Sequence, residues 1–143
     1  MKKILLAFTC LLVFAGCSTS DKKGKIEYTS IETAFEKMDQ KDSFLLLISK
    51  ESCSHCKDME AMFDETLKKH DTVIYNVKIN ESSEDAYNTD IAKLEERLDK
   101  PGRTPHTYYI EDGAVKDELV GFSKDTPDKF WDWVNDLGIE SIQ

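Results

Sequence analysis

Hydrophobic residues along the chain form several short runs that predict β-strands. The run Phe44-Leu45-Leu46-Leu47-Ile48 is continuously apolar, as in a strand buried on both faces, and predicts a strand over residues 43–49. Residues 72–79 are rich in β-branched and aromatic side chains, which also favours a strand. Residues 106–110 and 114–120 predict two more strands, joined by a hairpin turn at Glu111-Asp112-Gly113.

Four other segments place apolar residues three and four positions apart, which is the spacing of one helix face. The four sets are Ile31, Ala34, Phe35 and Met38; Cys56, Met59, Phe63 and Leu67; Tyr87, Ile91, Leu94 and Leu98; and Phe130, Trp133, Val134 and Leu137. Thr29 with Glu32 predicts a capping box at the first helix. Thr126-Pro127 predicts the start of the last helix, and Gly138 its end.

The predicted elements follow one another as helix, strand, helix, strand, helix, strand, strand, helix. Alternating strands and helices favour parallel strand pairs, and the late hairpin adds an antiparallel pair. The pattern therefore predicts an α/β domain with a mixed sheet and helices on both faces. A chain of 143 residues has room for one such domain.

The N-terminal segment has the features of a targeting sequence. Lysines precede an apolar stretch over residues 4–14, which is too short to span a bilayer and is typical of a secretory signal. It ends in Phe14-Ala15-Gly16-Cys17, which resembles a bacterial lipobox. We therefore expect a lipoprotein signal peptide over residues 1–16, a lipidated Cys17 with a polar tether over 17–25, and a domain over 26–143. This would place the protein on the extracytoplasmic face of a bacterial cell membrane. The alternative is an ordinary signal, cut nearby, that releases a soluble protein.

The composition is that of a folded domain with an acidic surface. Hydrophobic residues make up 40% of the chain and charged residues 33%, and the formal net charge is −9. Loss of Lys2 and Lys3 with the signal would make this charge −11. Nucleic acids bind basic surfaces, and anionic lipids attract polybasic segments. The charge of the domain therefore argues against both of these partners.

Two cysteines carry the candidate chemistry of the domain. Cys53 and Cys56 lie between the first predicted strand and the second predicted helix, whereas Cys10 and Cys17 belong to the leader. A helix N-terminus stabilises an anion through its free N–H groups. Thiols in Cys-x-x-Cys motifs accordingly have pKa values of about 3.5–7.5 instead of about 8.5. Cys53 is the candidate nucleophile and Cys56 its resolving partner, and no cofactor is expected beyond their disulfide.

Polar residues around the pair are candidates for tuning its reactivity. His55, and Ser54 beside it, are expected to affect the stability of the Cys53 thiolate, although His55 as a plain solvent-facing residue is the alternative. Glu51 and Lys57 are candidate proton carriers for Cys56, or else only solvated charges. A structural zinc site needs four ligands, and the sequence has no second Cys-x-x-Cys motif. No metal site is expected.

The order of elements, with Cys-x-x-Cys between strand and helix, resembles the thioredoxin superfamily. A second motif, Arg103-Thr104-Pro105 directly before a predicted strand, supports the resemblance, which covers residues 26–138. It implies a thioredoxin-like α/β fold with a mixed sheet of about four to five strands. It also implies that Pro105 faces the cysteine pair as a cis-proline and that Thr104 contacts the substrate backbone.

Two positions depart from the thioredoxin pattern. Leu47 stands where thioredoxins carry a buried aspartate, and Ser52 stands where they commonly carry tryptophan. In the family, the aspartate is thought to help deprotonate the second cysteine during reduction of substrates. Its replacement by Leu47 therefore disfavours an efficient reductase.

Together, leader and domain look most like the small lipid-anchored thioredoxin-like proteins of Gram-positive bacteria, including the bacteriocin transport accessory group. This resemblance implies a thiol–disulfide oxidoreductase acting on cysteine-containing secreted or surface proteins, with a membrane or extracytoplasmic redox partner. Oxidation or isomerisation is favoured, because Thr104 before Pro105 and the Cys-x-His-Cys arrangement resemble protein disulfide isomerases. The alternatives are a reductase fed by a membrane electron carrier and a redox-inactive binding module.

Overall fold

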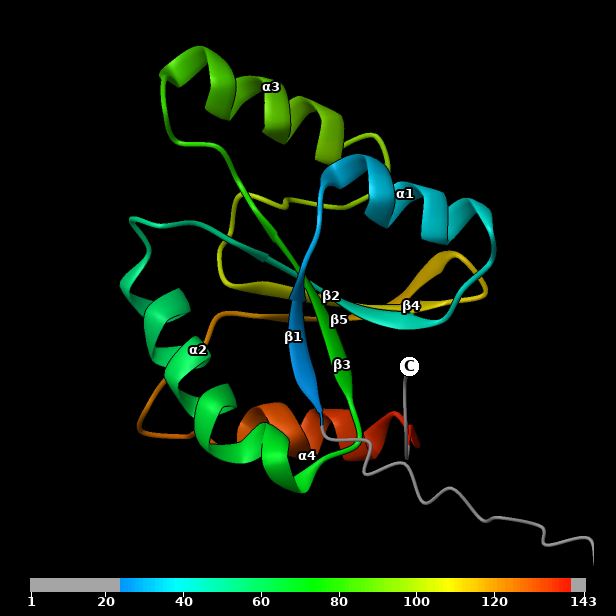
Figure 1. The fold of residues 1–143 in the computed structure, drawn as a ribbon, viewed down its shortest axis with the longest axis vertical. Helices are drawn as coiled ribbons and strands as arrows, with labels where there is room; N and C mark the ends of the chain where they lie inside the picture. Colours follow the sequence, from blue (N-terminus) through cyan, green and yellow to red (C-terminus); the bar gives the residue numbers. More distant parts are fainter. Residues whose placement is uncertain (1–23, 140–143) are drawn as a thin grey trace, which may run out of the picture.

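A five-stranded mixed sheet forms the middle of the molecule (Figure 1). The structure is a computed structural model, and it describes residues 24–139. The strand order is β1-β3-β2-β4-β5, in which β3 is parallel to β1 and β2, and β4 is antiparallel to β2 and β5. The strands are β1 (Lys25–Tyr28), β2 (Phe44–Ser49), β3 (Val73–Lys78), β4 (His106–Glu111) and β5 (Ala114–Val120). The four predicted strands are confirmed, as is the mixed sheet.

The edge strand β1 is the element that the hydrophobic pattern does not predict. Its sequence, Lys-Ile-Glu-Tyr, has one aliphatic residue, and none of its side chains is fully buried. Main-chain pairing with β3 forms this strand, and just before it the Gly24 N–H donates to the His70 carbonyl at 2.7 Å. β1 therefore includes Lys25, the last residue of the predicted tether. The predicted signal peptide and Cys17 lie outside the described residues.

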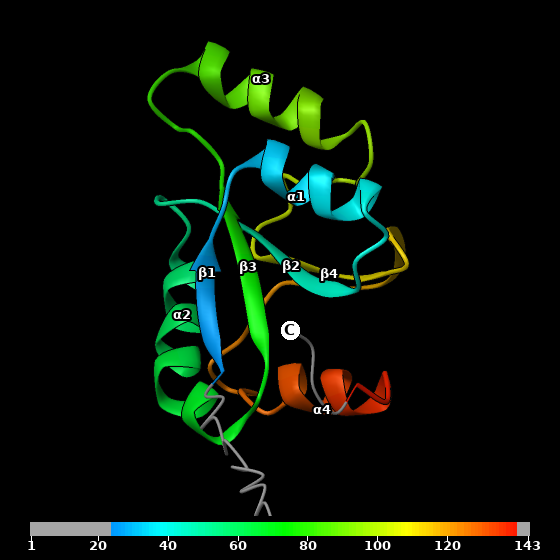
Figure 2. The same ribbon diagram turned by 45° about the vertical axis from the view of Figure 1, so that its right-hand side comes forward.

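Helices cover both faces of the sheet, with α1 and α3 on one side and α2 and α4 on the other (Figures 1 and 2). They are α1 (Ile31–Asp39), α2 (Ser54–Thr66), α3 (Glu84–Leu94) and α4 (Lys129–Asp136), and a 3-10 turn, η1 (Leu67–Lys69), continues α2. The predicted α/β class is thus confirmed as a three-layer arrangement. Within residues 24–139, no helix has the length and apolar character needed to cross a membrane.

Two helix starts differ from the prediction by a few residues. Ser30, not Thr29, caps α1, and its hydroxyl oxygen accepts from the Thr33 N–H at 3.1 Å. The helix α4 begins at Lys129, so Thr126-Pro127 belongs to the preceding turns. Several residues near both starts can act as caps, and the sequence signal does not choose between neighbours separated by one to three positions.

The core lies on both sides of the central strand β2. All six residues of β2 are buried, because successive side chains point to opposite faces and each face is covered by a helix layer. On the α2 side, Phe63 is fully buried, and its ring packs edge-on against Phe130 at 4.9 Å and Trp131 at 6.2 Å. These contacts fix α2, and therefore its N-terminus, against the sheet and α4.

We expect Phe63→Ala to lower the free energy of unfolding by about 3–5 kcal/mol, because it removes a buried aromatic ring and leaves a cavity. The measurement is urea denaturation of both proteins under reducing conditions. Val115→Ala is the control, since Val115 is 39% exposed on β5, and we expect that change to stay within about 0.5 kcal/mol. A Phe63→Ala effect of the same small size would contradict the assigned packing of α2.

Candidate functional site

Cys53 and Cys56 lie where the buried strand β2 leads into helix α2. The strand ends at Ser49, and after a short turn Cys53 occupies the N-cap position of α2 in an extended backbone conformation. The two cysteines form a disulfide, and their Cα atoms are 5.2 Å apart. The strand-to-helix placement predicted from the sequence is confirmed.

The sulfur of Cys53 acts as the helix cap. The Cys56 N–H donates to Cys53 Sγ at 3.1 Å, so a free N–H of the first turn points at this atom. Cys53 is 9% exposed and Cys56 only 2%. The more accessible sulfur is therefore also the one that the helix N-terminus would stabilise as a thiolate.

The loop before β4 brings Thr104 and Pro105 next to the cysteine pair. The Thr104–Pro105 peptide bond is cis, as the thioredoxin resemblance implies, and the Thr104 carbonyl oxygen lies 3.5 Å from Cys53 Sγ. On the other side of the loop, the Gly121 N–H donates to the Pro105 carbonyl at 2.7 Å. Two motifs about 50 residues apart in the sequence thus meet at one sulfur atom.

The other predicted residues surround the pair without bonding to it. Ser54, His55 and Lys57 are exposed on the first turn of α2, and in the part of the chain that the structure describes neither Ser54 nor His55 donates to a cysteine sulfur. The Glu51 carboxylate pairs with Lys78 at 2.8 Å. Tuning by Ser54 and His55, and proton transfer by Glu51 or Lys57, stay predictions.

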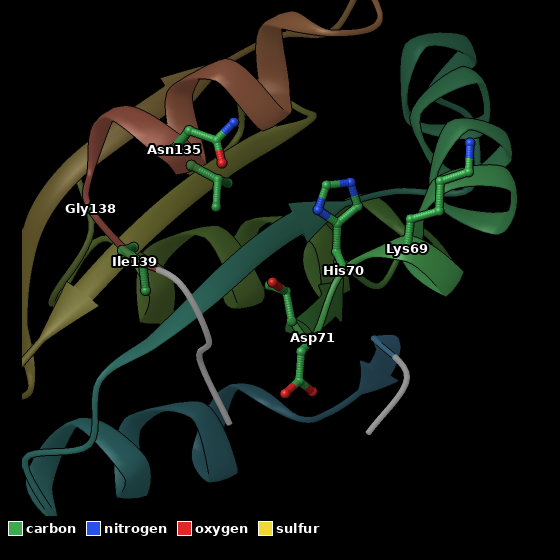
Figure 3. Close-up of a pocket in the computed structure, with 8 residues that line it drawn as sticks. Lys69, His70, Asp71, Asn135, Gly138 and Ile139 are labelled. Carbon is green, nitrogen blue, oxygen red and sulfur yellow. The ribbon is translucent and has the colours of Figure 1, made fainter. Parts of the chain in front are cut away.

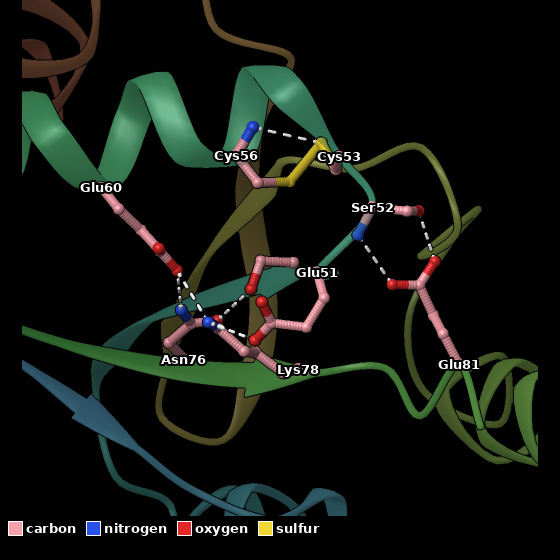
Figure 4. A network of polar contacts seen from close by, with 9 residues as sticks. Glu51, Ser52, Cys53, Cys56, Glu60, Asn76, Lys78 and Glu81 are labelled. Carbon is pink, nitrogen blue, oxygen red and sulfur yellow. Dashed lines mark hydrogen bonds and ion pairs between the residues drawn. A yellow bond between two sulfur atoms is a disulfide. The ribbon is translucent and has the colours of Figure 1, made fainter.

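A carboxylate from the β3–α3 loop holds the segment directly before Cys53, and no motif in the sequence indicates this contact. Glu81 accepts from the Ser52 N–H at 2.9 Å and also from the Ser52 hydroxyl (Figure 4). These bonds, the hydroxyl first, lower the pKa of the Glu81 carboxyl from its ordinary value. Ser52, at the usual tryptophan position, therefore serves to tie the loop to a neighbouring segment.

A buried polar network lies under α2, close to the cysteine pair (Figure 4). Asn76 of β3 is fully buried, and its side-chain oxygen accepts from the Ser49 hydroxyl at 2.8 Å. Its amide nitrogen donates to Glu60 of α2 at 3.4 Å, and the Lys78 ammonium lies 3.4 Å from the same Glu60 oxygen. Lys78 thus bridges Glu60 and Glu51. Sequence spacing does not reveal this network, because its members come from three elements.

A second buried group fixes the Thr104-Pro105 loop from the opposite face of the sheet. The Tyr108 hydroxyl donates to the Asp99 carbonyl at 2.6 Å, and His106 Nδ1 lies 2.7 Å from that hydroxyl. Burial lowers the pKa of His106. The Lys100 carbonyl and the Glu118 carboxylate act in the opposite direction and raise it, and a Glu118 oxygen lies 3.3 Å from His106 Nε2. Burial also disfavours the charged form of Tyr108, and this raises the pKa of its hydroxyl. These groups anchor both ends of the segment that carries Pro105.

A separate pocket of about 400 Å³ lies between the end of η1 and the C-terminal end of α4 (Figure 3). His70 borders it and stacks on Trp131 with ring centroids 3.6 Å apart. Within residues 24–139 there is no cluster of three or more His, Cys, Asp or Glu side chains that could hold a metal ion.

Comparison with known proteins identifies the fold. No protein-family model and no curated protein sequence matches the chain. Among solved structures, thioredoxin f from spinach chloroplast (short form) aligns with a TM-score of 0.58 at 16% identity, covering 82% of this chain and 97% of that one. Thioredoxin from Trypanosoma brucei brucei aligns with a TM-score of 0.54 at 14% identity, covering 84% and 95%. A chain in the complex of ferredoxin:thioredoxin reductase with thioredoxin f2 aligns with a TM-score of 0.60 at 12% identity, covering 82% and 99%. The protein therefore has a thioredoxin-like fold, with the Cys53–Cys56 disulfide at the N-terminus of α2.

Proposed function

We propose that this protein is a thiol–disulfide oxidoreductase in which Cys53 exchanges with substrates and Cys56 resolves the intermediate. The observation that carries the proposal is the difference between the two sulfurs. Cys53 is 9% exposed and receives an N–H of the helix start at 3.1 Å, whereas Cys56 is only 2% exposed. This is the division of labour that dithiol exchange needs, because the attacking group must be both accessible and ionised.

The reaction runs through a mixed disulfide. The Cys53 thiolate attacks a substrate disulfide, so a bond forms between Cys53 Sγ and one substrate sulfur while the other substrate sulfur leaves as a thiolate. Cys56 then attacks Cys53 Sγ and closes the Cys53–Cys56 disulfide, which releases the first substrate sulfur. The substrate gains two electrons that the cysteine pair loses. Oxidation of a substrate dithiol is the same sequence in reverse.

The substrates of this proposal are cysteine-containing secreted or surface proteins. The Thr104 main chain, 3.5 Å from Cys53 Sγ, is available to pair with an extended substrate segment beside the attacked sulfur, as the resemblance implies. One neighbour in the structure comparison was solved with a thioredoxin reductase. By analogy, a membrane or extracytoplasmic redox partner would restore the active form of this protein.

The proposed direction of exchange is oxidation or isomerisation. A helix N-terminus that stabilises the Cys53 thiolate stabilises the reduced form, and this makes the disulfide a better oxidant. With Leu47 at the position of the thioredoxin aspartate, the central strand carries no acid, and Thr104 before Pro105 resembles the arrangement in protein disulfide isomerases. The proposed place of action is the outer face of the cell membrane, supported by the lipobox-like Phe14-Ala15-Gly16-Cys17.

We expect Cys56→Ala to trap covalent adducts with substrate proteins in cells, because the mixed disulfide on Cys53 then has no resolving thiol. Non-reducing gels of the tagged variant should show these adducts, and a thiol reductant should remove them. Cys53→Ala is the matched control and should form none. A Cys56→Ala strain without thiol-sensitive adducts would favour the redox-inactive binding module.

The reduction potential of the Cys53–Cys56 couple tests the direction of electron flow. Equilibration of the purified protein with glutathione buffers should give a value between about −180 and −120 mV, the range of isomerases and oxidants. A value near about −270 mV, as in thioredoxin, would instead support the reductase. His55→Pro should make the couple more reducing, and an unchanged potential would show that His55 is only a linker residue.

Replacement of Cys17 by Ala should abolish lipidation and move the protein out of the membrane fraction, since stable anchoring takes two acyl chains. Cell fractionation with mass measurement of the mature N-terminus checks this outcome. Ser18→Ala, next to the same site, is the control and should stay membrane-bound. The lipoprotein assignment is wrong if the parent protein is itself released from the membrane. It is also wrong if the Cys17→Ala variant stays membrane-bound at unchanged mass.

A further inference from the structure

The resolving thiol needs a proton acceptor that the central strand does not supply. Cys56 is 2% exposed, and only its thiolate can attack the mixed disulfide. Burial in apolar surroundings disfavours a charged sulfur, so a base within reach would accelerate the step. Leu47, also buried, offers an apolar side chain on the strand under the pair.

The sheet face under α2 nevertheless carries polar groups. Leu47 is paired with Asn76 across β2 and β3, and Ser49 lies two residues further along the same face of β2. The Ser49 hydroxyl donates to the Asn76 side-chain oxygen, which turns the amide NH₂ toward Glu60 of α2. A fully buried amide is thus used to hold the carboxylate of a helix residue.

Glu60 lies one turn after Cys56 on the same helix. Positions four apart are neighbours on a helix surface, with Cβ atoms about 5–6 Å apart. Figure 4 shows both side chains on the side of α2 that faces β2 and β3. The Glu60 carboxylate is held by Asn76 and Lys78 through one oxygen, Oε1, each at 3.4 Å. Within residues 24–139, its other oxygen accepts no hydrogen bond from a side chain or backbone group.

We propose that Glu60 is the proton acceptor for the Cys56 thiol in the resolving step. This inference rests on the proposed function and assigns a further residue to the same site. The proton of the Cys56 thiol passes to the Glu60 carboxylate through intervening water. The Cys56 thiolate attacks Cys53 Sγ, the Cys53–Cys56 bond forms, and the bond from Cys53 to the substrate sulfur breaks. The substrate sulfur leaves as a thiolate, and Glu60 later returns its proton to solvent.

The other charged residues near the pair are less suited to this role. The Glu51 side chain is 71% exposed and its Oε1 is engaged by Lys78 at 2.8 Å. Lys57 is exposed and directly follows Cys56, and Asp58 is two positions away, so neither shares a helix face with the thiol. Glu60 combines the right helix face with a carboxylate that the buried network fixes in place.

The test separates the two exchange steps in time. The full-length chain, with Cys10 and Cys17 replaced by Ser in every variant, is reduced and mixed with dithiobis-nitrobenzoate in a stopped-flow instrument across a range of pH. Attack by Cys53 releases one coloured thiolate, and attack by Cys56 on the mixed disulfide releases the second. The second phase therefore reports the resolving step alone.

We expect Glu60→Gln to slow the second phase at least about tenfold at neutral pH, in line with the contribution of general acid–base groups. The first phase should stay within about twofold of the parent, and the difference in the second should shrink at high pH, where the thiol ionises without help. Glu60→Asp, which keeps a shorter carboxylate, should fall between Glu60→Gln and the parent. Glu65→Gln removes the same charge from an exposed position of α2 and should change neither phase.

A second phase within twofold of the parent in Glu60→Gln would overturn the assignment of Glu60 and leave the proposed function intact. A slowing by Glu51→Gln while Glu60→Gln keeps the parent rate would assign the role to Glu51 and likewise overturn this proposal. A parent protein that releases the first thiolate but never the second would overturn the proposed function itself, and the assignment with it. Thermal unfolding of each reduced variant confirms that the rates compare folded proteins.

Discussion

The capping of α2 by a cysteine sulfur is the interaction on which the rest of the site depends. An N-cap side chain usually offers an oxygen to the free N–H groups of the first turn, and here Cys53 Sγ takes that place at 3.1 Å from the Cys56 N–H. The cap is polarisable and can become anionic, so the helix start stabilises the atom that we propose as the nucleophile. Holding that helix start in place requires a rigid strand before it and a packed helix after it. The fully buried β2 and the contacts of Phe63 with α4 meet these two requirements.

The loop opposite the cap depends on packing from both faces of the sheet. On the side of the cysteines, the Thr104 carbonyl approaches Cys53 Sγ, while on the other face the His106 and Tyr108 side chains are tied to the segment that precedes Pro105. The Glu81 carboxylate fixes the other flank by binding Ser52. The Cys53 sulfur thus lies between the start of α2 and the Thr104-Pro105 loop, and Glu81 ties down the segment before it. In the proposed exchange, the Thr104 main chain is the group available to a substrate segment beside Cys53 Sγ.

Local chemistry explains which parts of this arrangement the sequence could predict. The apolar run of β2, the helical spacing after Cys56 and the Cys-x-x-Cys and Thr-Pro motifs are local signals, and the structure confirms the elements they predict. The strand β1 carries no such signal, because pairing with β3 forms it. The contacts among Ser49, Asn76 and Glu60 are not predictable from the sequence either. A single polar residue in a strand or helix does not indicate which distant residue it will bind. Long-range polar contacts depend on register and helix placement, and these follow only from the completed fold.

The network under α2 also has a physical logic of its own. A buried amide such as Asn76 costs free energy unless its donors and acceptor are bonded, and Ser49 and Glu60 provide those partners. The distance between an acid on the strand and the Cys56 thiol would stay constant only as long as helix and sheet do not shift against each other. Glu60 and Cys56 belong to one helix, so their spacing is set by helix geometry and survives small shifts of α2 against the sheet. The proposed acid, Glu60, would then belong to the same helix as the two cysteines of the proposed exchange.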